Sequence, residues 1–277
     1  LTVLTVAIIF GGIHRIAKVS SSIVPVMALG YILLALVIVF MNITHLPDVI
    51  KLIISHAFGW EQALGGGIGV ALMQGIKRGL FSNEAGMGSA PNVAATADVT
   101  HPVKQGLIQT LGVFSDTLII CTCTAFIILC SGIPLGGETN GVQLTQMALD
   151  NQIGNGGTIY VAIAILFFAF SSIIGNYYYG EANLRYITHN KWVMIIFRLM
   201  TGAMVMFGAL ASLDLAWSLA DICMGLMTIC NLIAIVLLGK YAFRLLDDYL
   251  KQKKAGIKNP VFTKDKMKDI EEDIECW

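Results

Sequence analysis

The sequence predicts an all-α protein that crosses a membrane several times. Hydrophobic residues make up 56% of its 277 residues, whereas charged residues make up only 13%. A soluble domain usually carries about a quarter charged residues, so the shortage of charge is the stronger of these two signals. The mean hydropathy is +0.74. The apolar residues gather in runs of about 20, the length that a helix needs to cross the hydrocarbon core of a bilayer.

These apolar runs define the predicted spans. The chain opens with a truncated run at Leu1–Ile13, and two shorter amphipathic stretches, Leu46–His56 and Gly141–Asp150, predict interfacial helices. After Lys240 the sequence becomes charged, which predicts a juxtamembrane helix in solvent and then a mobile end rather than another span. The remaining predicted spans are Ser22–Met41, the interrupted Ala63–Ala97, Leu107–Cys130, Thr158–Tyr178, Trp192–Leu210 and Leu213–Leu238.

The basic residues predict the orientation of the spans, because cytoplasmic connections carry the excess of Lys and Arg. One set of alternating connections holds nearly all of these residues, and the opposite set holds only Lys51. Since the C-terminal tail belongs to the basic set, we expect a multi-pass protein of the cell (plasma or inner) membrane with a cytoplasmic C-terminus. The basic set includes Arg15, Lys18, Lys104, Arg185, Lys191 and the start of the tail, Lys240, Arg244, Lys251, Lys253 and Lys254, and Arg198 lies nearer the same end of its span.

Composition also limits the kinds of molecule that the protein is expected to bind. The formal net charge is zero, which argues against nucleic acid or another acidic polymer as a partner. The six cysteines show no paired zinc-type spacing, so we expect free thiols that pack as small apolar groups. The chain begins inside an apolar run, with neither an initiator Met nor a signal peptide. We therefore expect it to be the C-terminal part of a longer protein.

The interrupted span contains the stretch "RGLFSNEAGMGSAPN", Arg78–Asn92. A glycine costs about 1 kcal/mol relative to alanine inside a helix, so the closely spaced Gly79, Gly86 and Gly88 favour local unwinding. Pro91 suits the first turn of a new helix, and Ser89 is a plausible N-cap for it. The pattern predicts a half-helix, a break at Gly79–Gly88 and a second half-helix.

Such a break can bind polar groups inside the membrane. Freed carbonyls can coordinate a cation, and the N–H groups at a half-helix start can bind a carboxylate. Glu84 would need a partner there, and Lys77 and Arg78 are the nearest cations in sequence. Two other interpretations stay open: glycines that serve only helix packing, or a plain loop between two short hairpins. Against the loop, the apolar flanks Ile68–Met73 and Val93–Ala97 are each too short to cross alone.

At the break the sequence resembles a known family. "GLFSNEAGMGSAP", "HPVKQG", "FSDTLIICTCTA", "FAFSSIIGNYYYGE" and "WSLADICMGLMTICNL" are similar to segments of the alanine/glycine:cation symporters, also called amino-acid carrier proteins. The resemblance runs from the first residues to about Leu238. It implies a LeuT-type fold of five-plus-five inverted repeats, with the end of repeat 1 and all of repeat 2 in this chain. The other repeat-1 helices would come from a missing N-terminal part of the same protein.

The resemblance also implies how the chain divides. Residues 1–42 would be the end of core helix 4 and core helix 5, and residues 43–60 an external connection with an interfacial helix. Residues 61–99 would be the discontinuous core helix 6. Residues 105–240 would form core helices 7–10, and residues 241–277 a charged cytoplasmic tail.

The implied activity is symport of sodium with a small neutral amino acid, alanine or glycine, with glutamine as a further candidate. Sodium is the expected coupling ion, and no organic cofactor is expected. Ser171 and Ser172 match the position where LeuT-type proteins bind sodium; the alternative is that they bond to carbonyls of their own helix. The expected substrate-binding residues are Gly79, Phe81, Ser82, Asn83, Gly86 and Gly88, with Glu84 bracing the unwound backbone.

Two further polar positions are candidates for supporting roles. Asp116, about nine residues into its apolar run, either lies near the membrane interface or supports the binding region electrostatically. Trp217, Asp221 and Asn231 share a rough helical face. Trp217 either gates an external vestibule or belongs to an interfacial aromatic belt. Asn176 and Tyr177–Tyr179 are expected to be packing and membrane-interface residues.

Two other function classes compete with a symporter. A channel could use the break as a re-entrant filter. An intramembrane enzyme would need a nucleophile with a base, or a metal cluster. All five histidines fall in connections or at span ends, and no HExxH pattern occurs, so we do not expect an enzyme.

Overall fold

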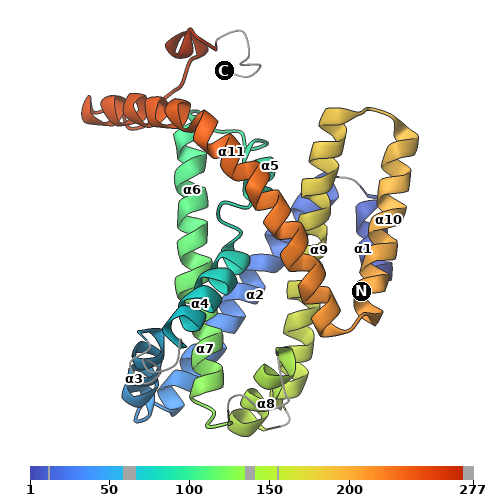
Figure 1. Ribbon diagram of the computed structural model, residues 1–277, viewed down its shortest axis with the longest axis vertical. Coiled ribbons are helices and arrows are strands. Elements are labelled where there is room, and N and C mark those ends of the chain that lie inside the picture. Colours follow the sequence, from blue (N-terminus) through green and yellow to red (C-terminus); the bar gives the residue numbers. More distant parts are fainter. Residues whose placement is uncertain (12, 59–66, 135–140, 155, 271–277) are drawn as a thin grey trace. The chain divides into compact units, whose positions relative to one another are not determined.

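The computed structural model describes residues 1–11, 13–58, 67–134, 141–154 and 156–270, and all regular structure within them is helical (Figure 1). The prediction of an all-α chain is therefore confirmed. In order, the elements are α1 (Thr2–Ile9), α2 (Ile13–Met41), α3 (Leu46–Ala57), α4 (Gly67–Asn83), α5 (Ser89–Ala94), α6 (Pro102–Phe114), the π-helix η1 (Ser115–Ile120), α7 (Cys121–Leu129), α8 (Val142–Ile153), α9 (Gly156–Ile187), α10 (Lys191–Leu210), α11 (Leu213–Lys254) and the 3₁₀-helix η2 (Lys264–Met267).

Five helical segments among the described residues are long and apolar enough to cross a membrane. They coincide with the five uninterrupted full-length runs predicted from the sequence, and several extend further. Hydropathy marks only the part of a helix that meets lipid, whereas backbone hydrogen bonding continues into the polar flanks. The segments are Ser21–Met41, Pro102–Leu129, Gly156–Ile187, Lys191–Leu210 and Leu213–Lys254.

The helices divide between two compact units. The first unit contains Leu1–Asn83 and Phe114–Ser212, and the second contains Glu84–Val113 and Leu213–Trp277. Each unit therefore combines two stretches that are distant in the sequence.

Two apolar clusters hold the first unit together. The larger one joins α2, α3, α7, α8 and α9, and a hydrogen bond of 2.8 Å between the Tyr31 hydroxyl and Thr124 Oγ1 lies beside it. The smaller one joins α1 and α9. The amphipathic stretches predicted at Leu46–His56 and Gly141–Asp150 are helical, as α3 and α8. The larger cluster consists of Tyr31, Ala35, Ile38, Val49, Ile127, Cys130, Ala148, Leu149 and Val161, and the smaller of Ile9, Phe170, Ile174 and Tyr177.

A buried ion cluster links α9 to α10 within the first unit. Glu181 is fully buried, and its Oε1 accepts a hydrogen bond of 2.6 Å from the Arg185 guanidinium. Arg198 of α10 lies 3.4 Å from the same oxygen, donates to the Tyr177 hydroxyl at 3.1 Å and stacks over the Phe10 ring. Tyr177 is thus a packing residue, as predicted.

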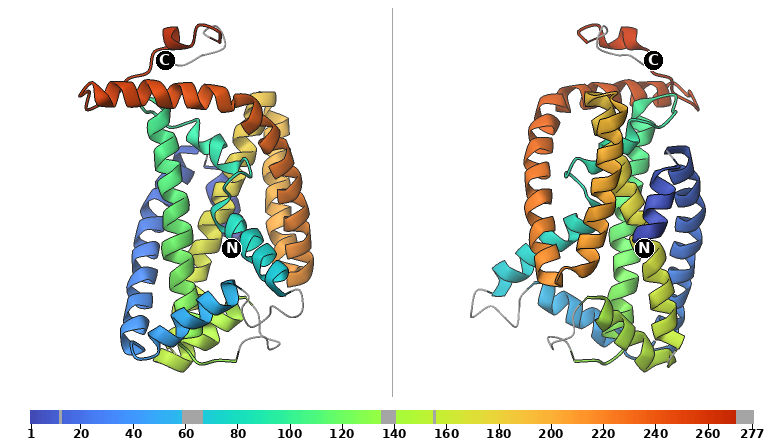
Figure 2. Two further views of the ribbon diagram at one scale, coloured as in Figure 1. Left: turned by 60° about the vertical axis from the view of Figure 1, so that its left-hand side comes forward. Right: turned by 90° about the vertical axis from the view of Figure 1, so that its right-hand side faces the viewer.

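The second unit is built around α11, whose C-terminal part turns away from the direction of its first part (Figure 2). The chain then folds back. The Phe262 amide donates to the Thr100 carbonyl at 2.9 Å, and Gln252 exchanges two hydrogen bonds with the Val261 backbone. The mobile end predicted after α11 is therefore wrong for this segment, because Phe262 and Met267 are buried. Residues 271–277 of the predicted tail, with Cys276, lie outside the described residues, and the five described cysteines are free thiols.

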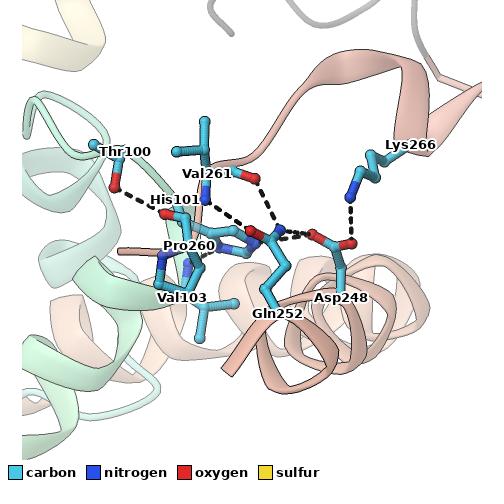
Figure 3. A network of polar contacts seen from close by, with 8 residues as sticks. All are labelled: Thr100, His101, Val103, Asp248, Gln252, Pro260, Val261 and Lys266. Carbon is cyan, nitrogen blue, oxygen red and sulfur yellow. Dashed lines mark hydrogen bonds and ion pairs between the residues drawn. The ribbon is translucent and has the colours of Figure 1, made fainter. Parts of the chain in front are cut away.

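His101 lies at the centre of this docked tail (Figure 3). Its ring is fully buried and meets Tyr249 and Phe262 edge-on. His101 Nδ1 accepts a hydrogen bond from the Val103 amide at 3.2 Å, which caps the start of α6. Its Nε2 faces Asp248 Oδ2 at 3.4 Å, and Asp248 Oδ1 accepts from Lys266 at 2.8 Å.

Candidate functional site

The helix break predicted from the glycine pattern is present. Helix α4 ends at Asn83, the chain is non-helical from Glu84 to Gly88, and α5 begins at Ser89 (Figure 1). Three of these residues have positive φ: 53° at Glu84, 79° at Gly86 and 93° at Gly88. Two glycines reach such angles at little cost. The predicted span before Gly67 includes residues 63–66, which lie outside the described residues.

The break is shorter than the sequence predicted. Gly79, Phe81, Ser82 and Asn83 form the last turns of α4 instead of belonging to the unwound part. One glycine lowers helix propensity without ending a helix when both neighbours continue its hydrogen bonding. The polar residues of the expected site are therefore presented from a helix terminus, and only Gly86 and Gly88 lie in the turn.

In the first unit, side chains from α4, η1 and α7 come together at the end of α4. Ser82 Oγ donates to Asp116 Oδ2 at 2.5 Å and lies 3.2 Å from Cys121 Sγ. Asn83 Nδ2 donates to Thr117 Oγ1 at 2.7 Å. Asp116, for which a supporting role is predicted, thus contacts Ser82, one of the expected substrate-binding residues.

Asp116 and Thr117 belong to η1, the π-helix between α6 and α7. A π-turn widens the helix by one residue, and π-bulges are frequent at functional sites. Nothing in the sequence indicated this element. It presents the adjacent side chains of Asp116 and Thr117 to the adjacent side chains of Ser82 and Asn83.

The end of α4 is suited to binding a cation. The last four carbonyls of an α-helix have no partners within the helix, and they form the negative end of its dipole. The Asp116 carboxylate adds to that negative potential. An ammonium group or a sodium ion would be favoured there. Phe81 offers the apolar surface nearby, and the Arg78 guanidinium lies 5.9 Å from its ring centroid.

In the second unit, a set of short-range hydrogen bonds shapes the turn. The Met87 amide donates to the Glu84 carbonyl at 3.1 Å, and Asn92 Nδ2 donates to the Gly88 carbonyl at 3.0 Å. Glu84 Oε2 accepts a hydrogen bond from the Ser89 hydroxyl, and the bracing role expected of Glu84 stays a prediction. The predicted N-cap role of Ser89 is wrong: Gly88 holds that position, and Ser89 is the first helical residue.

One further bond reaches the turn from α11. Asn231 Nδ2 donates to the Gly86 carbonyl at 2.9 Å. The carbonyls of Glu84, Gly86 and Gly88 thus each accept a hydrogen bond from the protein. The sequence placed Asn231 on the same helical face as Trp217, and nothing in the pattern indicated its partner, 145 residues away.

The remaining predicted residues receive no test from these contacts. Ser171 Oγ donates to the Phe168 carbonyl of its own helix at 2.9 Å, as the alternative interpretation predicts, and Ser172 is exposed. Trp217 is 37% exposed on α11. Their roles in sodium binding and gating stay predictions.

The chain is similar to known proteins over most of its length. A family model for the sodium:alanine symporter family matches residues 1–264. The probable sodium/glutamine symporter GlnT of Bacillus subtilis (strain 168) is 54% identical over 98% of this chain and 56% of its own length. The amino-acid carrier protein AlsT of the same strain is 52% identical over 100% and 59%. The sodium/alanine symporter AgcS of Methanococcus maripaludis is 42% identical over 86% and 53%. The chain thus spans little more than half the length of these relatives.

Proposed function

Because the chain belongs to the sodium:alanine symporter family, a family of transporters and not of enzymes, we propose that the complete protein couples sodium entry to amino-acid uptake. The expected substrate is a small neutral amino acid: alanine or glycine, with glutamine as a further candidate because one relative is named for it. The observation that carries the proposal is the helix that stops at Asn83 beside a carboxylate and resumes at Ser89.

The residues proposed to bind substrate are those that the resemblance implies, and each side of the break is considered by itself. At the end of α4, the Asp116 carboxylate and the helix dipole favour the substrate ammonium, and Ser82 and Asn83 offer hydrogen bonds. Phe81 covers the small apolar side chain. Gly86 and Gly88 keep the turn free of side chains, so that backbone N–H groups can approach the substrate carboxylate.

Sodium is a co-transported substrate in this proposal, with Ser171 and Ser172 as its ligands. A ligand can shift a conformational equilibrium only by its different affinities for the two states. Sodium would therefore bind the substrate-ready outward state more tightly than the inward state, and alternating access follows from that difference. Trp217 would gate the external side.

The proposal also includes the architecture. The five-plus-five LeuT-type repeat would assign residues 1–42 to core helices 4 and 5, 61–99 to core helix 6 and 105–240 to core helices 7–10. The connection 43–60 would be external. The tail 241–277 would be cytoplasmic, in a protein of the cell membrane.

The test uses the full-length protein, including the part that precedes this chain, in proteoliposomes. Counterflow of labelled alanine, glycine and glutamine is measured with and without a sodium gradient, and a potassium gradient of equal size serves as the control. We expect saturable uptake that requires sodium. Uptake that is independent of the sodium gradient would contradict the symport proposal. Currents at ion-flux rates without saturable dependence on amino acid would favour a channel.

A further inference from the structure

The hydrogen bond from Asn231 differs in kind from the others in the broken segment. The bonds to Glu84 and Gly88 described above begin and end within residues 84–92. Asn231 comes from α11, 145 residues later, and donates to the carbonyl of Gly86 near the middle of the turn. Local bonds fix the shape of a turn, whereas a bond from another helix also fixes the position of the turn relative to that helix.

The backbone of Gly88 packs against the same side chain. A Cβ at Gly88 would lie 2.9 Å from Asn231 Cβ, closer than real Cβ atoms approach, and 3.0 Å from its Cγ, which is tighter than most real contacts. Asn231 therefore holds the turn at two points, by a hydrogen bond at Gly86 and by van der Waals contact at Gly88. Both points belong to residues with positive φ.

We propose that Asn231 is a positioning residue for the substrate site: its amide on α11 holds the unwound segment Glu84–Gly88 in the conformation that binds substrate. This inference rests on the proposed function, because its first test measures amino-acid transport. Without the bond, the Gly86 carbonyl loses its donor, and the turn can adopt conformations that do not bind. The apparent affinity falls with the fraction of molecules that remain competent, by roughly tenfold for one lost hydrogen bond.

Two substitutions separate the amide donor from simple packing. Asn231→Leu keeps the branched shape at Cγ, with a larger side chain, and removes the donor. Asn231→Asp keeps the shape and has a donor only when the carboxyl group is protonated. We expect both to raise the KM for substrate roughly tenfold near neutral pH, with the maximum rate per folded molecule largely retained. Asn231→Asp should recover affinity as the pH falls, relative to wild type at each pH, and Asn231→Leu should not.

Thr228→Val is the matched control. Thr228 lies one turn earlier on α11, and its Oγ1 bonds to the Met224 carbonyl of the same helix at 2.7 Å. This change removes a polar group from the same helix without touching the turn, so KM should stay at the wild-type value. An equal increase of the KM in Thr228→Val would show a general effect of substitutions in α11 and would overturn the specific role of Asn231.

A second readout needs no transport. Amide hydrogen exchange, followed by mass spectrometry of a peptide covering residues 84–92, reports the opening of the turn in the full-length protein. Both Asn231 variants should exchange faster there than wild type and Thr228→Val. Unchanged exchange, or faster exchange with wild-type KM, would overturn the inference. If wild type shows no sodium-dependent uptake, the proposed function fails, and the exchange experiment still decides whether Asn231 holds the turn.

Discussion

Gly88 and Gly86 form a matched pair at which strain and steric contact can be separated. Both have positive φ, but a Cβ at Gly86 meets nothing within 4 Å, whereas a Cβ at Gly88 meets Asn231. Gly86→Ala should cost about 1–2 kcal/mol of stability from left-handed strain alone. Gly88→Ala should cost a further 1–3 kcal/mol, roughly, because the side chain overpacks. Thermal unfolding of the full-length protein in detergent measures both, and equal losses would contradict the Asn231 contact.

Asp116→Asn tests whether the charge or only the hydrogen bond matters at the end of α4. The amide oxygen of the variant can still accept from Ser82, so the shape is kept and the negative charge is lost. We expect sodium-coupled uptake to weaken by about tenfold or more in apparent substrate affinity, because the site attracts a cation less strongly. Asp48→Asn on α3 removes a charge elsewhere in the first unit and should have no effect. Full sodium-coupled uptake by Asp116→Asn would count against the supporting role.

At the scale of single residues, the sequence predicted where the backbone breaks better than it predicted which side chains form hydrogen bonds with each other. Glycine spacing correctly indicated a break, because propensity is a local property. It could not show that Glu84 adopts a positive φ, since that conformation depends on the bonds around it. Nor could it predict the hydrogen bond between Ser82 and Asp116, which lie 34 residues apart in the sequence.

At the scale of helices, the apolar runs predicted where the spans lie but not how far the helices extend. Helix α9 continues to Ile187, beyond the predicted Tyr178, and ends with a charged last turn. The π-helix η1 had no sequence signal, because one extra residue in a single turn hardly changes the hydrophobic periodicity. The element that carries Asp116 and Thr117 was therefore visible only in the structure.

The ion cluster at Glu181 predicts unequal roles for its two arginines. Arg185 belongs to the same helix as Glu181 and is 51% exposed, while Arg198 is 17% exposed and joins α10 to α9 and to Phe10, which directly follows α1. Both arginines contact the same buried carboxylate, but half of the Arg185 side chain is in contact with solvent, whereas loss of the largely buried Arg198 also removes its contacts with Tyr177 and Phe10. Arg198→Met should therefore lower the melting temperature in detergent more than Arg185→Met. The reverse order would show that Glu181 depends mainly on its own helix.

At the scale of the whole chain, the largest departure from the sequence prediction is the tail. Alternating charges after Lys240 are typical of a solvated helix and a free end. Phe262 and Met267 are nevertheless buried, and the tail reaches back to residues 100 and 101. The Thr100 hydroxyl also donates to the Pro260 carbonyl, 160 residues away, and contacts at such a distance leave no periodic pattern in the sequence.

Docking of the tail should become weaker at low pH because of His101, whose buried ring joins the tail to the start of α6. Burial, with smaller effects of Lys266 and Lys104, holds the pKa of His101 below its usual value, although Asp248 acts in the opposite direction. The docked state therefore favours the neutral ring, whose Nδ1 must stay unprotonated to accept from the Val103 amide. Docking is fully stable above about pH 6.5, the usual pKa of histidine, and weakens as the pH falls below that value, because the undocked form then binds more protons.

Amide hydrogen exchange at Phe262, corrected for the intrinsic effect of pH, measures this docking, since that amide is bonded to the Thr100 carbonyl. We expect faster opening at pH 5.5 than at pH 7.5 in wild type. His101→Asn keeps an acceptor for the Val103 amide without a titrating ring, so it should open to the same extent at both pH values. His189→Asn, in the connection between α9 and α10, should keep the wild-type dependence, and its loss there would assign the titration to another group.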